Sequence, residues 1–228
     1  MLVIKVIFFD TETSGLDCTC CKIIELAMYT VVDGDVVERY DEFIDIGEPI
    51  SPKISDLTGI TNSMLKNEGI DEKTAACDLK KRLTPDTLMV AHNCQFDLLF
   101  VYNLLYRQFQ EEAFEIVQNV KWLDTMSVLK DRKDYPHKLV DAVDYYNIEK
   151  VNFHRAIDDT KALYYVALAM KDERDDLKEY INVFGYNPKY GVGGARFPFI
   201  EYKAQPYHNR GKLPQDKILP RKSNQRIR

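Results

Sequence analysis

The sequence predicts an α/β fold built on a mixed β-sheet with helices on its faces. Two features of the hydrophobic pattern support this: strand-like runs come first and are joined by a tight turn, and helical and strand-like segments alternate after them. Strands joined by a tight turn are antiparallel, whereas strands separated by a helix are usually parallel. The 228 residues allow one large domain with a tail, and a hydrophobic content of 45% supplies a sizeable core.

Three strands are predicted near the start of the chain. Residues 3–9 are β-branched and aromatic and end at the polar residues 10–13, which is typical of a buried strand. Residues 23–32 and 36–44 form two more strand-like runs, and Asp33-Gly34-Asp35 between them is a strong hairpin signal. We therefore expect three antiparallel strands.

Helices dominate the middle of the chain. Gly59 can end one short helix and Thr61 can cap the next. Asp97 and Asp159 each fall on the apolar stripe of a longer predicted helix. The expected order is short helices within 51–83, a strand at 87–91, a helix from residue 97, a strand at 120–123 and a last long helix at about 157–170.

The composition changes after about residue 184. Five of the nine prolines and five of the ten glycines lie beyond it, which is typical of loops or extended chain. Residues 201–228 contain eight basic and two acidic residues, a net charge of +6, which leaves −11 on the rest of a chain whose total is −5. We therefore expect a domain over 1–184 and a basic extension over 185–228, which either holds a nucleic-acid backbone or is a solvated end.

The cysteines and the hydropathy indicate a cytoplasmic protein without a membrane anchor. No apolar stretch reaches the roughly 18 residues that span a bilayer. The five cysteines are an odd number in a chain too large to need disulfides, so we interpret them as free thiols. Cys18, Cys20 and Cys21 lack the second Cys/His pair of a closed zinc site and predict a thiol-rich loop, whose role stays open.

Four acidic residues carry the functional prediction. Asp10 and Glu12 lie two apart at the end of the first strand, so both side chains point to one face. Asp97 and Asp159 are costly on apolar helix faces unless an arginine or a metal compensates them, and few basic residues are placed to pair with both. Four converging carboxylates favour two Mg²⁺ or Mn²⁺ ions about 4 Å apart, with Asp10 as the bridging ligand, a site that hydrolyses phosphodiesters.

Two further residues are candidates for this site. His154 stands five residues before Asp159 and must precede the helix, so it is either a general base above the metals or a surface loop histidine. Glu25 lies within an apolar run, where it either supports the metal cluster or pairs with a basic residue.

The acidic residues lie in three segments: Phe9-Asp10-Thr11-Glu12-Thr13-Ser14-Gly15-Leu16, Val90-Ala91-His92-Asn93-Cys94-Gln95-Phe96-Asp97 and His154-Arg155-Ala156-Ile157-Asp158-Asp159. In order and spacing these resemble the exonuclease motifs of the DnaQ-like, DEDDh-type 3′→5′ exonucleases, over about residues 4–171. The resemblance implies a ribonuclease H-like fold, with Asp10, Glu12, Asp97 and Asp159 as metal ligands and His154 as general base. The related tyrosine branch would need Tyr where this chain has Arg155.

The same resemblance nominates residues that contact the substrate. Thr13, Ser14 and Leu16 follow the first motif and would touch the 3′-terminal nucleotide, with Leu16 against the last base. Phe96 is a further candidate, because aromatic side chains stack on any base of a single-stranded end. For Leu16 and Phe96 the alternative is an ordinary place in the core.

We therefore predict a metal-dependent 3′→5′ exonuclease acting on single-stranded or frayed nucleic-acid ends, with DNA replication or repair favoured over RNA degradation. The alternatives are an oligoribonucleotide exonuclease, an endonuclease of the same fold group, and a non-catalytic module that binds nucleic-acid ends or tethers a DNA polymerase. Gln215-Asp216-Lys217-Ile218-Leu219 faintly resembles peptides that dock on sliding clamps.

Overall fold

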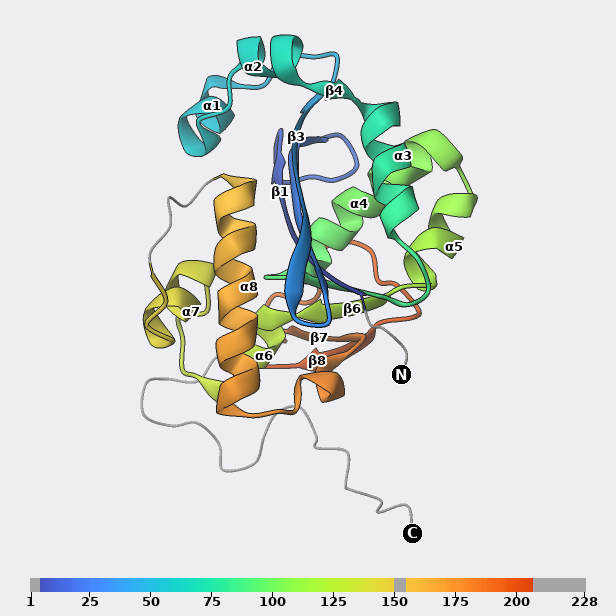
Figure 1. The fold of residues 1–228 in the computed structure, drawn as a ribbon. Coiled ribbons are helices and arrows are strands. Elements are labelled where there is room, and N and C mark those ends of the chain that lie inside the picture. The colour runs from blue at the N-terminus through green and yellow to red at the C-terminus, as the bar shows by residue number, and fades with distance from the viewer. Residues whose placement is uncertain (1–4, 150–154, 207–228) are drawn as a thin grey trace.

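A six-stranded mixed sheet forms the centre of the protein (Figure 1). The computed structural model describes residues 5–149 and 155–206. The strand order across the sheet is β4-β3-β2-β1-β5-β6. The strands are β1 (Lys5–Thr13), β2 (Ile23–Val32), β3 (Asp35–Asp45), β4 (Ile70–Asp71), β5 (Thr87–Ala91) and β6 (Lys121–Asp124).

Strand directions confirm the predicted mixed sheet. β1, β2 and β3 are antiparallel neighbours, whereas β5 runs parallel to β1 and β6 runs parallel to β5. The hairpin between β2 and β3 is tight because Val32 pairs directly with Asp35. Asp33 and Gly34 form its two-residue loop with φ of 53° and 95°, the left-handed conformation that this turn requires.

Two short helices meet at the residues that the sequence marks, whereas the helix expected from residue 97 begins three residues earlier, at Cys94. Thr61 accepts a hydrogen bond from the backbone N–H of Met64, and Gly59, at φ 73°, ends the preceding helix. The helices are α1 (Pro52–Thr58), α2 (Asn62–Glu68), α3 (Glu72–Arg82), α4 (Cys94–Phe109), α5 (Glu112–Gln118), α6 (Thr125–Arg132), α7 (Leu139–Tyr145), α8 (Ala156–Glu173) and the 3₁₀ helix η1 (Leu177–Tyr180).

Helices cover both faces of the sheet (Figure 1). Alternate residues of β1 explain how, because successive strand side chains point to opposite faces. Phe8 joins a cluster that contains Leu163 of α8, and Phe9 joins another that contains Leu104 of α4. Helices α4 and α8 are thus held on opposite sides of the same central strand.

The chain after α8 packs against the domain within the described residues. β7 (Val183–Tyr186) and β8 (Glu201–Ala204) form a small parallel sheet, and the Asn182 N–H donates to the Trp122 carbonyl at 2.7 Å. The sequence places residues 185–206 in an extension, but Phe197 and Ile200 are buried in the core. These two apolar side chains make core contacts. The glycines and prolines around them indicated extended chain, so the sequence did not predict those contacts.

No helix among the described residues is long and apolar enough to cross a membrane. The sliding-clamp-like segment 215–219 and most of the basic tail lie outside the described residues.

Candidate active site

Three carboxylates meet at one point on the α8 side of β1. Asp10 and Glu12 stand on β1, and Asp159 lies in the first turn of α8. One oxygen from each side chain lies within 4.8 Å of the others. The predicted pairing of Asp10 and Glu12 on one strand face is therefore confirmed, and α8 brings Asp159 to them. Hard divalent cations prefer such a set of oxygen ligands.

The fourth carboxylate, Asp97, reaches the site from the opposite face. It lies in the first turn of α4 and is 3% exposed. The Thr11 hydroxyl, which points away from Asp10 on β1, donates a hydrogen bond to Asp97 Oδ1 at 2.8 Å. Asp97 is not one of the three residues whose oxygens lie within 4.8 Å, but its charge acts on Asp10.

The pKa values of Asp10, Glu12 and Asp97 are raised, because burial and like charge make their ionised forms unfavourable when no cation is bound. Burial first, and then the charges of Asp97, Asp159 and Glu12, hold the pKa of Asp10 well above its usual range. Burial and Asp159 raise the pKa of Glu12 to about 7, and burial also raises the pKa of Asp97 to about 7. A bound divalent cation would offset this crowding.

Glu25 is neutralised by an arginine. Its fully buried carboxylate accepts hydrogen bonds from Arg155 Nε at 3.0 Å and Nη2 at 2.9 Å, and a third from the Ala156 N–H at 3.1 Å. Glu25 also lies opposite Glu12 in the β1–β2 register. Of the two alternatives from the sequence, the structure therefore supports the ion pair. The pair fixes the start of α8, three residues before Asp159.

The residues nominated for substrate contact differ in their surroundings. The Thr13 hydroxyl donates to the Gly15 carbonyl at 2.7 Å, and Ser14 Oγ accepts from the Lys22 N–H at 3.0 Å, so both shape the loop after β1. Leu16 is 87% exposed, which excludes a core position in this structure. Phe96 is partly buried and packs on Phe100, with 4.8 Å between ring centroids.

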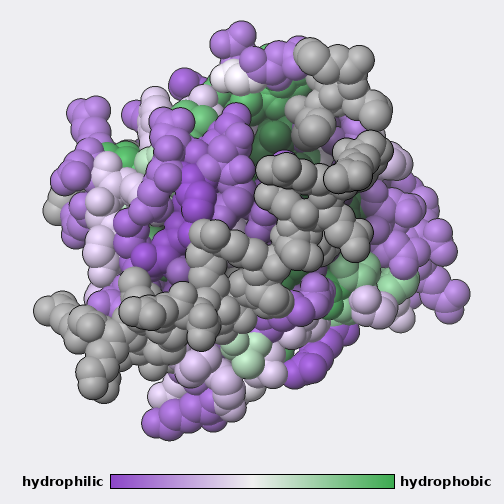
Figure 2. Space-filling view, turned by 90° about the horizontal axis from the view of Figure 1, so that it is seen from below, coloured by the Kyte–Doolittle hydropathy of each residue, from purple (hydrophilic) through white to green (hydrophobic). Residues whose placement is uncertain are grey.

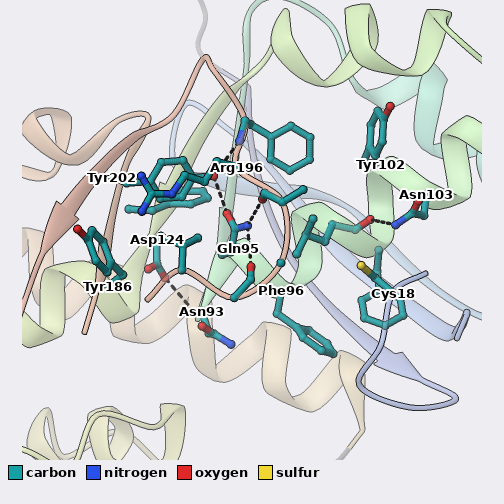
Figure 3. Close-up of a pocket in the computed structure, with 18 of the residues that line it drawn as sticks. Cys18, Asn93, Gln95, Phe96, Tyr102, Asn103, Asp124, Tyr186, Arg196 and Tyr202 are labelled. Carbon is teal, nitrogen blue, oxygen red and sulfur yellow. Dashed lines mark hydrogen bonds between the residues drawn. The ribbon is translucent and has the colours of Figure 1, made fainter. Parts of the chain in front are cut away.

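Leu16 and Phe96 line one cleft of about 750 Å³ (Figure 3), and none of the four predicted metal ligands is among its lining residues. Part of its wall comes from the segment after β7, including Arg196, which the sequence prediction missed because nothing local to that segment indicates a site. Cys18 lines the cleft as well, and all five cysteines are free thiols. The predicted base, His154, lies outside the described residues.

Comparisons with known proteins agree with this arrangement. Residues 7–167 match the RNase T-type family model described as exonuclease. The chain is 36% identical over 178 residues to a PolC-type DNA polymerase III of Halalkalibacterium halodurans, covering 75% of this chain and 12% of that protein. It is 32% identical over 207 residues to the PolC-type polymerase of Bacillus subtilis, covering 89% of this chain and 13% of that protein. The chain thus spans about an eighth of these relatives' length.

Solved structures show the same fold. The structure of E. coli exonuclease I with a dA16 oligonucleotide matches with a TM-score of 0.68 and 20% identity, over 77% of this chain and 42% of that one. The predicted ribonuclease H-like sheet is thereby confirmed. The structural match, the acidic cluster and the family model point the same way, and the chain belongs to the RNase T-type, DnaQ-like exonuclease family.

Proposed function

We propose that this protein is a metal-dependent 3′→5′ exonuclease that releases nucleotides from single-stranded or frayed DNA ends. The convergence of Asp10, Glu12 and Asp159 within 4.8 Å is the observation that carries the proposal. The raised pKa values of Asp10 and Glu12 support it, because carboxylates held together at such cost are typical of functional sites.

Asp10, Glu12, Asp97 and Asp159 would hold two divalent cations, Mg²⁺ or Mn²⁺, and Asp10 is the proposed bridging ligand. When bound, such ions stabilise the charge on a phosphate under in-line attack and on the leaving oxygen. Thr11 keeps Asp97 oriented through its 2.8 Å hydrogen bond.

His154 is the proposed general base. It precedes α8 by two residues, and α8 carries the ligand Asp159 in its first turn. Imidazole titrates near neutral pH and is suited to remove a proton from the attacking water. The Arg155–Glu25 pair next to it anchors this part of the chain to β2.

The proposed substrate follows from the cleft and from the relatives. Leu16 and Phe96, which both line the cleft, would contact the terminal base, and Thr13 and Ser14 shape the loop between Leu16 and the proposed metal ligands. The polymerase relatives and a neighbour solved with a DNA oligonucleotide favour DNA and a proofreading or repair role. Association with a DNA polymerase is part of this proposal.

Direction and sugar preference are tested with 5′-labelled single strands of one sequence, made as DNA and as RNA, and with a DNA strand blocked by a 3′-phosphate. We expect a ladder that shortens from the 3′ end, faster on DNA, and slowed by the block. Internal cuts that ignore the block would support an endonuclease instead. Faster degradation of RNA would move the proposal to oligoribonucleotides.

A further inference from the structure

The cleft lined by Leu16 and Phe96 extends beyond these two residues, which are the ones proposed to contact the terminal base. Its floor is a stripe of α4 that includes Phe96, Leu99, Phe100 and Asn103. Lining residues of this part of the chain run from Asn93 to Asn103, about 15 Å at the rise of an α-helix. Since stacked bases lie about 3.4 Å apart along one strand, the cleft has room for more than one nucleotide.

The opposite wall is a loop, residues 191–196, that lies outside the part of the chain matched by the family model. Gln95 holds this loop on α4: its Nε2 donates to the carbonyls of Gly193 at 3.0 Å and Ala195 at 2.7 Å. Its Oε1 accepts from the Tyr202 hydroxyl at 2.9 Å. Gly194, at φ 74°, lies so close to α4 that a Cβ there would stand 2.5 Å from Leu99. The loop is therefore a fixed wall (Figure 3).

The loop 191–196 contributes a cation, Arg196, which lies next to the aromatic rings of Tyr186 and Tyr202. The Arg196 guanidinium lies 5.5 Å from the ring centre of Tyr186 and 5.4 Å from that of Tyr202, and the residue is exposed. In protein grooves that bind single-stranded nucleic acids, guanidinium groups contact phosphates and aromatic rings stack on bases.

The charges around the cleft favour a phosphate at Arg196. Arg196 is the basic residue among the described lining residues, and the acidic ones are Asp17 and Asp124. Asp124 is 3% exposed, and its oxygens accept from the backbone N–H groups of Asn93 and Cys94 and from the N–H and hydroxyl of Ser127. Its charge is therefore directed into the protein. Asp17 lies across the cleft, in the loop with Leu16.

We propose that this cleft binds the nucleotides that precede the 3′-terminal one, with Arg196 contacting a backbone phosphate and Tyr186 offering a ring face to a base. The proposal rests on the proposed function: Phe96 directly precedes Asp97 on α4, and Leu16 lies in the loop that follows Glu12 and β1. It adds a binding site contributed by the segment after β7. Gln95 is a positioning residue that holds the Arg196 loop in place.

The test compares Arg196→Ala, Arg196→Lys and Lys189→Ala in the full chain. Lys189 is the matched control: it is an exposed basic residue of the same segment, 5.2 Å from the Tyr190 ring, and does not line the cleft. The substrates are an oligothymidylate and thymidine 5′-(p-nitrophenyl phosphate), which has one nucleotide and lacks the preceding phosphates that the proposal assigns to Arg196. Rates are measured at several NaCl concentrations.

For Arg196→Ala we expect KM for the oligothymidylate to rise about tenfold, with a small change in kcat. The ratio of kcat/KM on the oligothymidylate to kcat/KM on the single-nucleotide ester should fall by the same factor. The salt dependence of log kcat/KM should become less steep by about 0.7, the value of one phosphate contact on a single strand. Arg196→Lys should keep that slope, and Lys189→Ala should behave as the unsubstituted protein does.

Equal losses on both substrates in Arg196→Ala, or an unchanged salt slope, would overturn the proposal. Binding of a fluorescein-labelled oligothymidylate in EDTA separates this result from a failure of the proposed function. An unsubstituted protein that cleaves neither substrate would refute the exonuclease. If Arg196→Ala still weakened oligonucleotide binding about tenfold in such an inactive protein, and Lys189→Ala did not, the proposal that the cleft binds nucleic acid would be supported. Oligonucleotide binding that is unchanged in Arg196→Ala would refute the proposed binding site in the cleft.

Discussion

Replacing Glu12 by Gln is expected to stabilise the metal-free protein, although it alters a site residue. Burial and the neighbouring Asp159 raise the pKa of Glu12 from 4.5 to about 7. At about pH 8 the folded protein must therefore keep an unfavourable charge that the unfolded chain carries freely. At about 1.4 kcal/mol per pH unit the difference between 4.5 and about 7 amounts to about 3.5 kcal/mol, and solvent at the partly buried side chain reduces it to about 2–3 kcal/mol.

The sign of the pH dependence follows from the raised pKa. Between about pH 4.5 and 7 the folded state binds more protons at Glu12 than the unfolded state, so stability of the metal-free protein falls as pH rises through this window. Glu12→Gln removes that loss. Its advantage over the unsubstituted protein should thus be greatest at about pH 8 and small at about pH 5.

Thermal unfolding in EDTA at these two pH values measures the effect. For a chain of this size, about 2–3 kcal/mol corresponds to a rise in Tm of roughly 4–12 °C at about pH 8. Glu48→Gln, at an exposed loop position, is the matched control and should change little at either pH. A Glu12→Gln protein that is no more stable than the unsubstituted one at about pH 8 would refute the account of a crowded carboxylate.

Three further predictions concern stability and cation binding. Arg155→Ala should destabilise the protein by about 2–3 kcal/mol in urea unfolding, because it leaves Glu25 buried and unpaired, while Arg155 itself is 38% exposed. Adding Glu25→Gln should recover much of the lost stability. A double variant with no recovery would contradict the ion-pair argument. Gly185→Ala should lower the urea midpoint by the equivalent of about 1–3 kcal/mol, since the new Cβ would stand 1.6 Å from Oε1 of the buried Gln205; an unchanged midpoint would contradict this packing. Mn²⁺ at a hundredfold excess over its Kd should stabilise the folded protein by about 2.7 kcal/mol, measured as a rise in Tm. Asp10→Asn should greatly reduce this rise in Tm. An equal rise in both proteins would show that the ion binds elsewhere.

Local signals were sufficient for most of the fold. The Asp33-Gly34 turn fixed the β2–β3 hairpin because that turn type requires residues that tolerate positive φ, and both do so in the structure. The spacing of Asp10 and Glu12 determined their common face for a similar reason, since side-chain direction in a strand alternates strictly.

Contacts between distant segments were beyond the sequence. Glu25 and Arg155 are 130 residues apart, so only the folded chain decides between an ion pair and a metal-supporting role. Gln95 similarly reaches the carbonyl of a residue 100 positions away. The glycines and prolines around Phe197 indicated extended chain, and the burial of this side chain depends on the α4 surface that receives it.

The most direct measurement is a time course of a 5′-labelled single-stranded DNA with the unsubstituted protein and with Asp10→Asn, each in Mg²⁺ and in EDTA. Asp10 is a member of the carboxylate cluster and feels the charges of Asp97, Asp159 and Glu12, and asparagine keeps its size while removing its charge. We expect stepwise shortening from the 3′ end by the unsubstituted protein in Mg²⁺ alone, and a loss of at least about a hundredfold in Asp10→Asn with circular dichroism unchanged. Cleavage that continues in EDTA, or a fully active Asp10→Asn protein, would contradict the metal-dependent mechanism.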